Sequence, residues 1–212
     1  MGWNPGTEKE VFTLAQLVKE FSIEKVQKAG AVFNIQRLDF LNGLYIREKP
    51  IEKLTELCKP YLKEAGLLVQ GQVSEKKLQE IVEVSKTRMK KLSDIVELSD
   101  FFFPDKLNYE KEMLKWDNMQ EKDIKEALLL CDKTLSELKN WEIKKIEEAL
   151  LRGAGEFNKQ KGYPENNKGY LLWPLRMALS GKQFSPSPFE IAGILGKEKT
   201  IERIIEAVKK YE

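Results

Sequence analysis

Apolar residues recur every three or four positions along most of this 212-residue chain, which is the spacing of one face of an α-helix. In the range 51–65, for example, Leu54, Cys58, Tyr61 and Leu62 fall on the same side of a helix. The same spacing returns near both ends of the chain. The pattern therefore predicts an all-α fold, built from amphipathic helices.

Candidate N-cap residues indicate where several of these helices begin. A serine, threonine or asparagine precedes an apolar-periodic run at Thr13, Asn34, Ser74 and Ser187. The predicted helices cover 13–21, 22–29, 34–49, 51–65, 74–103, 109–118 and 123–139, then a segment opening at 141, a helix around 176 that ends before 181, and two C-terminal helices broken at 196–197. We interpret the apolar stripes of the first four as core positions.

A run of three phenylalanines and a proline at 101–104 closes the helix that Ser74 begins. It divides the chain into two predicted helical subdomains, 1–104 and 105–212, stacked end to end so that Arg88 and Arg176 face one curved surface. The run could be a stacking platform for unpaired bases. It could also be a plug packed between two helical layers, which is the interpretation we favour because such runs are more often structural.

The chain contains no histidine. This removes the commonest general base, the commonest metal ligand and every Ser-His or Cys-His nucleophile. No glycine-rich phosphate loop follows a strand pattern, so nucleotide phosphate has no evident cradle. Carboxylate pairs at helical spacing are too frequent for any one to stand out. We predict no catalytic residue, metal site or cofactor in this chain.

The two cysteines, Cys58 and Cys131, are far apart and lack metal-ligand spacing, so we expect two reduced thiols. No apolar run is long enough to span a bilayer, and no signal-peptide pattern occurs. We therefore expect a cytoplasmic protein with no membrane partner.

Thirty-six basic residues against 34 acidic ones leave a net charge of only +2, so a nucleic-acid surface must come from local clustering. One such cluster, predicted to lie on a helix, comprises Lys86, Arg88, Lys90 and Lys91. Two or three of these side chains could contact a phosphate backbone. A solvated face balanced by acidic residues further along is an equally good interpretation.

Basic residues also dominate the range 152–182, with six cations against two carboxylates. Glycines and a proline predict that 153–169 is loop-rich. A basic loop that leads into a helix with a half-buried arginine suits sugar-phosphate positioning combined with base readout. The six cations are Arg152, Lys159, Lys161, Lys168, Arg176 and Lys182.

Arg176 lies in an otherwise apolar helical turn, so its guanidinium needs a partner or a ligand. The segment 185–188 follows, and within it Ser187 has Pro188 next and Glu190 three residues on, the spacing of a capping box. A rigid helix start with backbone N–H groups beside Arg176 would suit an anion or a base edge. A core ion pair between Arg176 and Glu190 is the alternative.

Several motifs occur in a characteristic order: Pro-Leu-Arg-x-Ala-Leu-Ser-Gly at 174–181, Ser-Pro-Ser-Pro at 185–188 and Ile-Leu-Gly-Lys-Glu at 194–198. They resemble the C-terminal anticodon-binding region of bacterial glutamyl-tRNA synthetases. Gly-Trp-Asn-Pro-Gly at 2–6 and Leu-Asn-Gly-Leu-Tyr-Ile-Arg at 41–47 also agree with that family. The resemblance covers essentially the whole chain.

The resemblance implies a helical array that binds the anticodon loop of the glutamate tRNA and joins an N-terminal catalytic domain. In such enzymes the catalytic half uses ATP and Mg²⁺, and its signatures are absent from this sequence. The resemblance therefore implies a monomeric tRNA-binding chain that is inactive as a ligase by itself.

The resemblance also implies roles for particular residues. Arg88 corresponds to an arginine that reads the third anticodon base and rejects the glutamine anticodon, and Arg176 to one that contacts the first base. A third segment matches residues that pack against the anticodon loop, namely Ser185, Pro186, Ser187 and Pro188. Pro188 stands where a small or aliphatic residue is expected. Candidates for tRNA backbone contacts are Lys86, Lys90, Lys91, Arg152, Lys159, Lys161, Lys168 and Lys182.

A different class of function also fits the sequence. A helical protein-interaction scaffold without RNA specificity could use the basic cluster and the phenylalanine run to meet a protein partner. Phosphate contacts make binding steeply salt-dependent, so salt dependence separates the two functions.

Overall fold

The protein is described by a computed structural model that covers residues 2–9, 11–26, 33–68 and 73–211. Within these residues all regular structure is helical, apart from one isolated β-bridge between Trp3 and Val26. The helices are α1 (Leu14–Glu20), η1 (Ile23–Lys25), α2 (Ile35–Glu48), α3 (Ile51–Glu64), α4 (Glu75–Lys86), α5 (Asp94–Ser99), η2 (Asp100–Phe102), η3 (Lys111–Leu114), α6 (Glu121–Ser136), α7 (Ile143–Lys161), α8 (Gly169–Ser180), α9 (Pro188–Leu195) and α10 (Lys197–Lys209). The predicted all-α fold is confirmed.

The N-terminal helices begin where the sequence predicts. The Thr13 hydroxyl accepts a hydrogen bond from the backbone N–H of Gln16, and the Asn34 side chain caps α2 in the same way. Of the predicted helix 22–29, only the short 3₁₀ turn η1 forms within the described residues, and positions 27–29 lie outside them.

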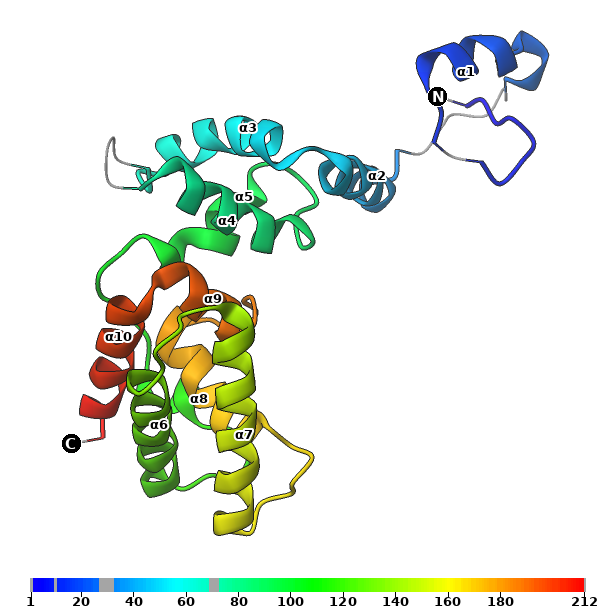
Figure 1. Ribbon diagram of the computed structural model, residues 1–212. Coiled ribbons are helices and arrows are strands. Elements are labelled where there is room, and N and C mark those ends of the chain that lie inside the picture. Colours follow the sequence, from blue (N-terminus) through cyan, green and yellow to red (C-terminus); the bar gives the residue numbers. More distant parts are fainter. Residues whose placement is uncertain (1, 10, 27–32, 69–72, 212) are drawn as a thin grey trace.

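Both N-terminal helices leave apolar side chains in solvent. Leu14 on α1 is 77% exposed, and α1 lies away from both hydrophobic cores (Figure 1). Exposed apolar residues on α2 include Ile35, Leu38, Phe40 and Tyr45. The interpretation of these two stripes as core positions is therefore wrong for these exposed side chains, while Leu17 and Leu41 of the same stripes are half-buried.

A first hydrophobic core lies between α3, α4 and α5. It is formed by Ile46, Leu54, Cys58, Leu62, Leu78, Val82, Met89 and Ile95. The predicted stripe of residues 51–65 is thus a true core face. Ser74 caps α4 through its hydroxyl, which accepts a hydrogen bond from the N–H of Lys77 at 3.3 Å.

The long helix predicted from Ser74 to the phenylalanine run is divided into α4 and α5. The Asp94 carboxylate accepts hydrogen bonds from the backbone N–H groups of Lys90 (2.8 Å) and Lys91 (3.0 Å). These bonds stabilise a turn in place of continued helix, as aspartate side chains commonly do. The basic cluster therefore lies mostly on a turn, and its prediction as a helical face is wrong.

A second core surrounds α8, which α6, α7, α9 and α10 enclose (Figure 1). Helix α8 is apolar on nearly all sides, as a central helix must be. At the start of α9, Ser187 and Glu190 form the predicted capping box. Gly196, with a φ of 85°, separates α9 from α10, which confirms the predicted break.

Two segments of this subdomain differ from the sequence-based prediction. Only η3 forms in the range 109–118. Tyr109, Leu114 and Met119, five residues apart, are all buried in the second core. On a continuous α-helix, residues at this spacing would point in three different directions, so a helix could not bury all three. Helix α7 continues through 153–161, which we predicted to be loop-rich. The burial of Leu150 and Phe157 on one face outweighs the roughly 1 kcal/mol by which a helical glycine is less favourable than alanine.

The two cores meet at the phenylalanine run. Phe101 and Phe102 are buried in the second core, and Phe103 packs against both. This confirms the plug and rules out a stacking platform at the two buried rings. Arg203 of α10, only 3% exposed, donates hydrogen bonds to the carbonyl oxygens of Leu179 (2.6 Å), Phe101 (2.8 Å) and Pro104 (2.8 Å). One guanidinium thus joins the end of α8 to the connection between the subdomains.

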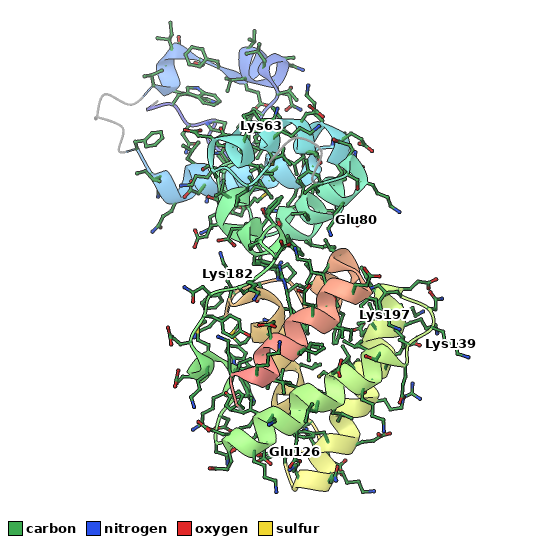
Figure 2. All side chains as sticks on the ribbon, turned by 90° about the vertical axis from the view of Figure 1, so that its left-hand side faces the viewer. Lys63, Glu80, Glu126, Lys139, Lys182 and Lys197 are labelled. Atoms are coloured by element: carbon green, nitrogen blue, oxygen red, sulfur yellow. The ribbon has the colours of Figure 1, made fainter. Side chains whose placement is uncertain are left out.

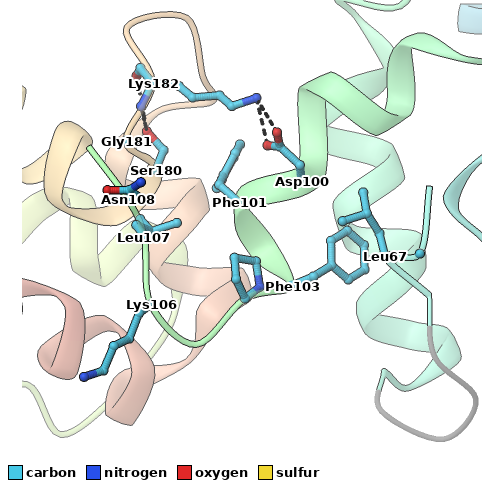
Figure 3. Close-up of a pocket in the computed structure, with 12 residues that line it drawn as sticks. Leu67, Asp100, Phe101, Phe103, Lys106, Leu107, Asn108, Ser180, Gly181 and Lys182 are labelled. Atoms are coloured by element: carbon cyan, nitrogen blue, oxygen red, sulfur yellow. Dashed lines mark hydrogen bonds and ion pairs between the residues drawn. The ribbon is translucent and has the colours of Figure 1, made fainter. Parts of the chain in front are cut away.

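Lys182 provides a second link at this connection, where Figure 2 shows it between the two subdomains. Its ammonium donates to the carbonyl oxygen of Glu97 (2.6 Å) and to the Asp100 carboxylate (2.8 Å). The pair borders a pocket of about 490 Å³ (Figure 3), with Leu67 and Phe103 on the side of the first subdomain. The subdomain boundary near residue 104 stays a prediction.

Candidate nucleic-acid interface

Arg176 is placed by the central helix α8. Its neighbours Leu175 and Met177 are fully buried in the second core, while Arg176 itself is half-buried. Among the described residues its guanidinium has no hydrogen bond and no ion pair. The alternative of a core ion pair with Glu190 is therefore not realised, since the Glu190 carboxylate instead accepts hydrogen bonds from the N–H and hydroxyl of Ser187, both at 2.8 Å.

The electrostatic surroundings of Arg176 are those of a cation that lacks a full counter-charge. Burial lowers the pKa of its guanidinium, the positive charge of Arg88 lowers it further, and the carboxylate of Glu190 raises it. Arg88 and Arg176 therefore lie within electrostatic reach of each other although they belong to different subdomains. A ligand with negative charge or acceptor atoms would relieve this repulsion.

Arg88 lies on the turn that follows α4. It is exposed, and its guanidinium donates to the carbonyl oxygen of Val84 at 3.0 Å. Val84 packs against the second core, and α4 contacts α9, so this turn sits where the two subdomains touch. The structure thus brings the two predicted base-reading arginines to one region of the surface.

Of the other lysines in the basic cluster, some are hydrogen-bonded or ion-paired within the protein and others are not. Lys86 donates to the carbonyl oxygen of Lys49 at 2.9 Å and is turned toward the end of α2. Lys90 and Lys91 are exposed, and the Lys91 ammonium is 3.9 Å from the Asp94 carboxylate. Lys90 is thus the most available lysine beside Arg88.

The segment 185–188, which joins α8 to α9, is stabilised mainly by contacts inside the protein. The Ser185 hydroxyl is buried and lies 3.2 Å from that of Ser180, and Pro186 and Pro188 are buried as well. Ser187 is half-buried, and its N–H is bonded to Glu190. The backbone N–H of Ser187 is therefore already bonded within the protein. The buried side chains of Ser185, Pro186 and Pro188 hold this segment from the inside.

The basic residues of 152–182 also separate into two groups. Arg152 and Lys159 are exposed on α7, and the Lys168 ammonium donates to the carbonyl oxygen of Glu165 at 2.7 Å. Lys161, in contrast, forms ion pairs with Asp123 (2.8 Å) and Glu126. Lys161 and Lys182 are thus engaged within the protein.

One exposed residue, eight positions after Arg176, escaped the sequence analysis. Phe184 lies in the loop between α8 and α9, and its side chain is 86% exposed. The sequence pattern that could have indicated this exposure is a large aromatic residue between two polar residues, Gln183 and Ser185, next to the segment 185–188.

Other chemistry has little support among the described residues. Cys58 and Cys131 are free and buried, and burial raises the pKa of the Cys58 thiol to about 12, so neither is a ready nucleophile. No cluster of three or more metal-binding side chains occurs in the described ranges. No described helix is long and apolar enough to cross a bilayer.

The chain is similar to known proteins along its full length. Residues 53–208 match the family described as an anticodon binding domain. The glutamate–tRNA ligase of Clostridium botulinum (strain Hall) is 38% identical over 216 residues, covering 100% of this chain and 41% of that protein. The glutamate–tRNA ligase of Desulforamulus reducens is 31% identical over 99% of this chain and 42% of its own length.

Solved structures agree with this similarity. A glutamate tRNA ligase from Elizabethkingia meningosepticum, crystallised with its amino acid, superposes with a TM-score of 0.79 and 26% identity over 100% of this chain and 39% of its own. The glutamate-tRNA synthetase from Elizabethkingia anophelis gives a TM-score of 0.76 and 28% identity over 98% of this chain and 38% of its own.

The chain thus spans about two fifths of the length of these relatives. Within that span, the family match covers well over half of the chain and includes both arginines of the candidate interface. The chain belongs to the anticodon binding domain family.

Proposed function

We propose that this chain binds the anticodon loop of the glutamate tRNA as the recognition part of a glutamate–tRNA ligase. The observation that carries the proposal is Arg176, a half-buried cation without a hydrogen-bond or ion-pair partner among the described residues, which lies near a second arginine, Arg88. An RNA loop supplies both the acceptor atoms and the negative charge that this pair lacks.

In this proposal the two arginines read bases, and exposed basic residues contact the RNA backbone. A guanidinium can donate two parallel hydrogen bonds to a base edge, which a lysine ammonium cannot do with the same geometry. Arg176 would contact the first anticodon base and Arg88 the third, where it would reject the glutamine anticodon. Lys90, Arg152 and Lys159 are the exposed candidates for phosphate contacts.

The remaining parts of the proposal concern the whole ligase. We place the joining of glutamate to tRNA, with ATP and Mg²⁺, in the catalytic part that this chain does not span. The described residues offer no metal cluster, so no Mg²⁺ site is assigned to them. A monomeric enzyme in the cytoplasm belongs to the same proposal.

The catalytic part would also account for the exposed apolar faces of α1 and α2. Side chains such as Leu14 (77% exposed) and Ile35 (65% exposed) favour contact with another folded surface over contact with RNA. We assign that surface to the catalytic part of the same ligase, because the relatives extend well beyond the region that this chain matches.

A titration tests the anticodon proposal directly. The chain is titrated at fixed low salt with glutamate tRNA and with variants that differ at one anticodon base each. Arg176→Ala and Arg88→Ala should each weaken the cognate complex by about 1–3 kcal/mol, because each removes a bidentate base contact. Each substitution should also flatten discrimination at one anticodon position only.

Arg152→Ala is the matched control for loss of a positive charge. It should weaken all tRNAs equally, because a phosphate contact carries no sequence information. If Arg176→Ala also weakened every tRNA equally, Arg176 would contribute only a charge contact, as Arg152 does, and would not read a base. If the wild-type chain bound all anticodon variants alike, the protein-scaffold function would be preferred.

A further inference from the structure

The loop between α8 and α9 presents one large apolar side chain to solvent. Phe184 is 86% exposed, more than any other large apolar residue among the described positions. The residues that flank its loop, Ser180 and Pro186, are buried. The ring is therefore accessible to a ligand, while these flanking residues on either side of it are buried.

The backbone on both sides of Phe184 is held firmly. On the N-terminal side, Gly181 ends α8 in a left-handed conformation with φ 62°, and Lys182 is anchored to Glu97 and Asp100. On the C-terminal side, the buried Ser185 hydroxyl contacts that of Ser180 at 3.2 Å. The ring is thus presented by a fixed support, which lowers the entropy lost when a ligand binds.

Phe184 is also tied to the environment of Arg176. The Ser180 hydroxyl donates to the carbonyl oxygen of Arg176 at 2.8 Å, and the same hydroxyl contacts Ser185, the residue next to Phe184. Ser180 therefore connects the last turn of α8, where Arg176 lies, to the residue that follows Phe184. An aromatic side chain and a base-reading arginine at the same end of α8 suit two unpaired nucleotides of one RNA loop.

We propose that Phe184 is a stacking platform for one unpaired nucleobase of the bound RNA loop. This inference rests on the proposed anticodon function and adds a contact to it. Stacking on an aromatic side chain is the usual way in which proteins hold splayed bases. It tolerates different bases, because every base has a π-face, so Phe184 would contribute affinity without reading a specific base.

The test uses three variants of Phe184 and a distant control. Phe184→Leu and Phe184→Ala should weaken binding of glutamate tRNA by about tenfold, the typical effect of losing one stacked base. Phe184→Trp should bind at least as well as the wild type, because it keeps an aromatic face. Phe33→Leu is the matched control: Phe33 is 74% exposed but lies before α2, in the other subdomain, so its substitution should leave affinity unchanged.

An abasic RNA series identifies the stacked base. Each loop position of the tRNA is replaced in turn by a nucleotide without a base. At the position that stacks on Phe184, the abasic RNA should bind the wild type about tenfold more weakly, and Phe184→Leu should then cause no further loss. At the other positions Phe184→Leu should keep its full effect.

The outcomes separate this inference from the proposed function. If the wild type discriminates anticodon bases but Phe184→Leu binds like Phe33→Leu, the stacking platform is excluded and anticodon binding stands. If Phe184→Leu weakens binding while no abasic position abolishes its effect, the ring contacts something other than a base and the inference is overturned. If the wild type does not bind the RNA loop at all, both proposals fail together. Circular dichroism checks that each variant is folded.

Discussion

At the scale of single residues, cations that look alike in the sequence have different surroundings. Lys159 and Lys161 are two positions apart on α7, yet Lys159 is exposed while Lys161 is paired with Asp123 and Glu126. Arg176 and Arg203 both lie on helices of the second core, but only the Arg203 guanidinium donates hydrogen bonds to backbone carbonyl oxygens. Charge type and spacing could not predict these differences, because each depends on which segment packs beside the helix.

The Asp123–Lys161 pair should make folding stability sensitive to acid. The Lys161 ammonium, together with the hydroxyl of Tyr163 at 2.8 Å, holds the pKa of Asp123 below its unfolded value of about 3.9. A lowered pKa means that the stabilisation is present above pH 4 and is lost as the pH falls toward the folded value. Urea unfolding at pH 7 and pH 3 should show a smaller acid loss for Asp123→Asn than for the wild type.

Asp105→Asn is the control for this measurement. The Asp105 side chain is 94% exposed and its contact with Lys199 is solvated, so its removal should leave the acid dependence close to that of the wild type. An Asp123→Asn variant with the same acid loss as the wild type would show that other carboxylates govern the transition.

At the scale of secondary structure, boundaries with a local cause were predictable and those with a tertiary cause were not. The caps at Thr13, Asn34, Ser74 and Ser187 act within one turn, and the structure confirms all four. The extension of α7 through its glycines depends on burial against other helices. The break between α4 and α5 involves a local Asp94 bond that the apolar periodicity does not report.

The start of α8 offers a test of close packing. A Cβ added to Gly169 would lie 2.5 Å from the indole of Trp116, which itself packs on Trp173. Gly169→Ala should therefore lower the free energy of unfolding by about 1–3 kcal/mol, measured by urea titration, because a rigid ring must move.

Gly155→Ala on α7 is the matched substitution for this test. Its added Cβ would meet only the flexible end of Lys168, at 3.5 Å. Alanine should then stabilise the helix by about 0.5–1 kcal/mol. Equal effects of the two substitutions would mean that Trp116 moves away without loss.

At the scale of the whole molecule, the candidate interface depends on the packing of the two subdomains against each other. Arg88 follows a helix of the first core, and Arg176 lies on the central helix of the second. The contact of α4 with α9, the plug at Phe103 and the bonds of Arg203 hold these parts together. Neither subdomain alone would place both guanidiniums on one surface.

The salt dependence of RNA binding should separate exposed cations from paired ones. Lys90→Met should reduce the slope of log affinity against log salt concentration by about 0.7–1, because one phosphate contact and its released counterion are lost. Lys161→Met should leave the slope unchanged, since Asp123 and Glu126 already neutralise that ammonium. A smaller slope for Lys161→Met would show that RNA displaces the carboxylates.

The sequence by itself determined the fold class, the capping residues, the plug at 101–104 and the segments that carry the candidate interface, because these depend on helical periodicity, local hydrogen bonds and recognisable motifs. Only the tertiary structure decided which cations are free, that the segment around Ser185 is stabilised by contacts inside the protein, and that Phe184 is exposed. Those properties depend on burial and on contacts between segments far apart in the chain, and the order of residues along one segment does not contain them.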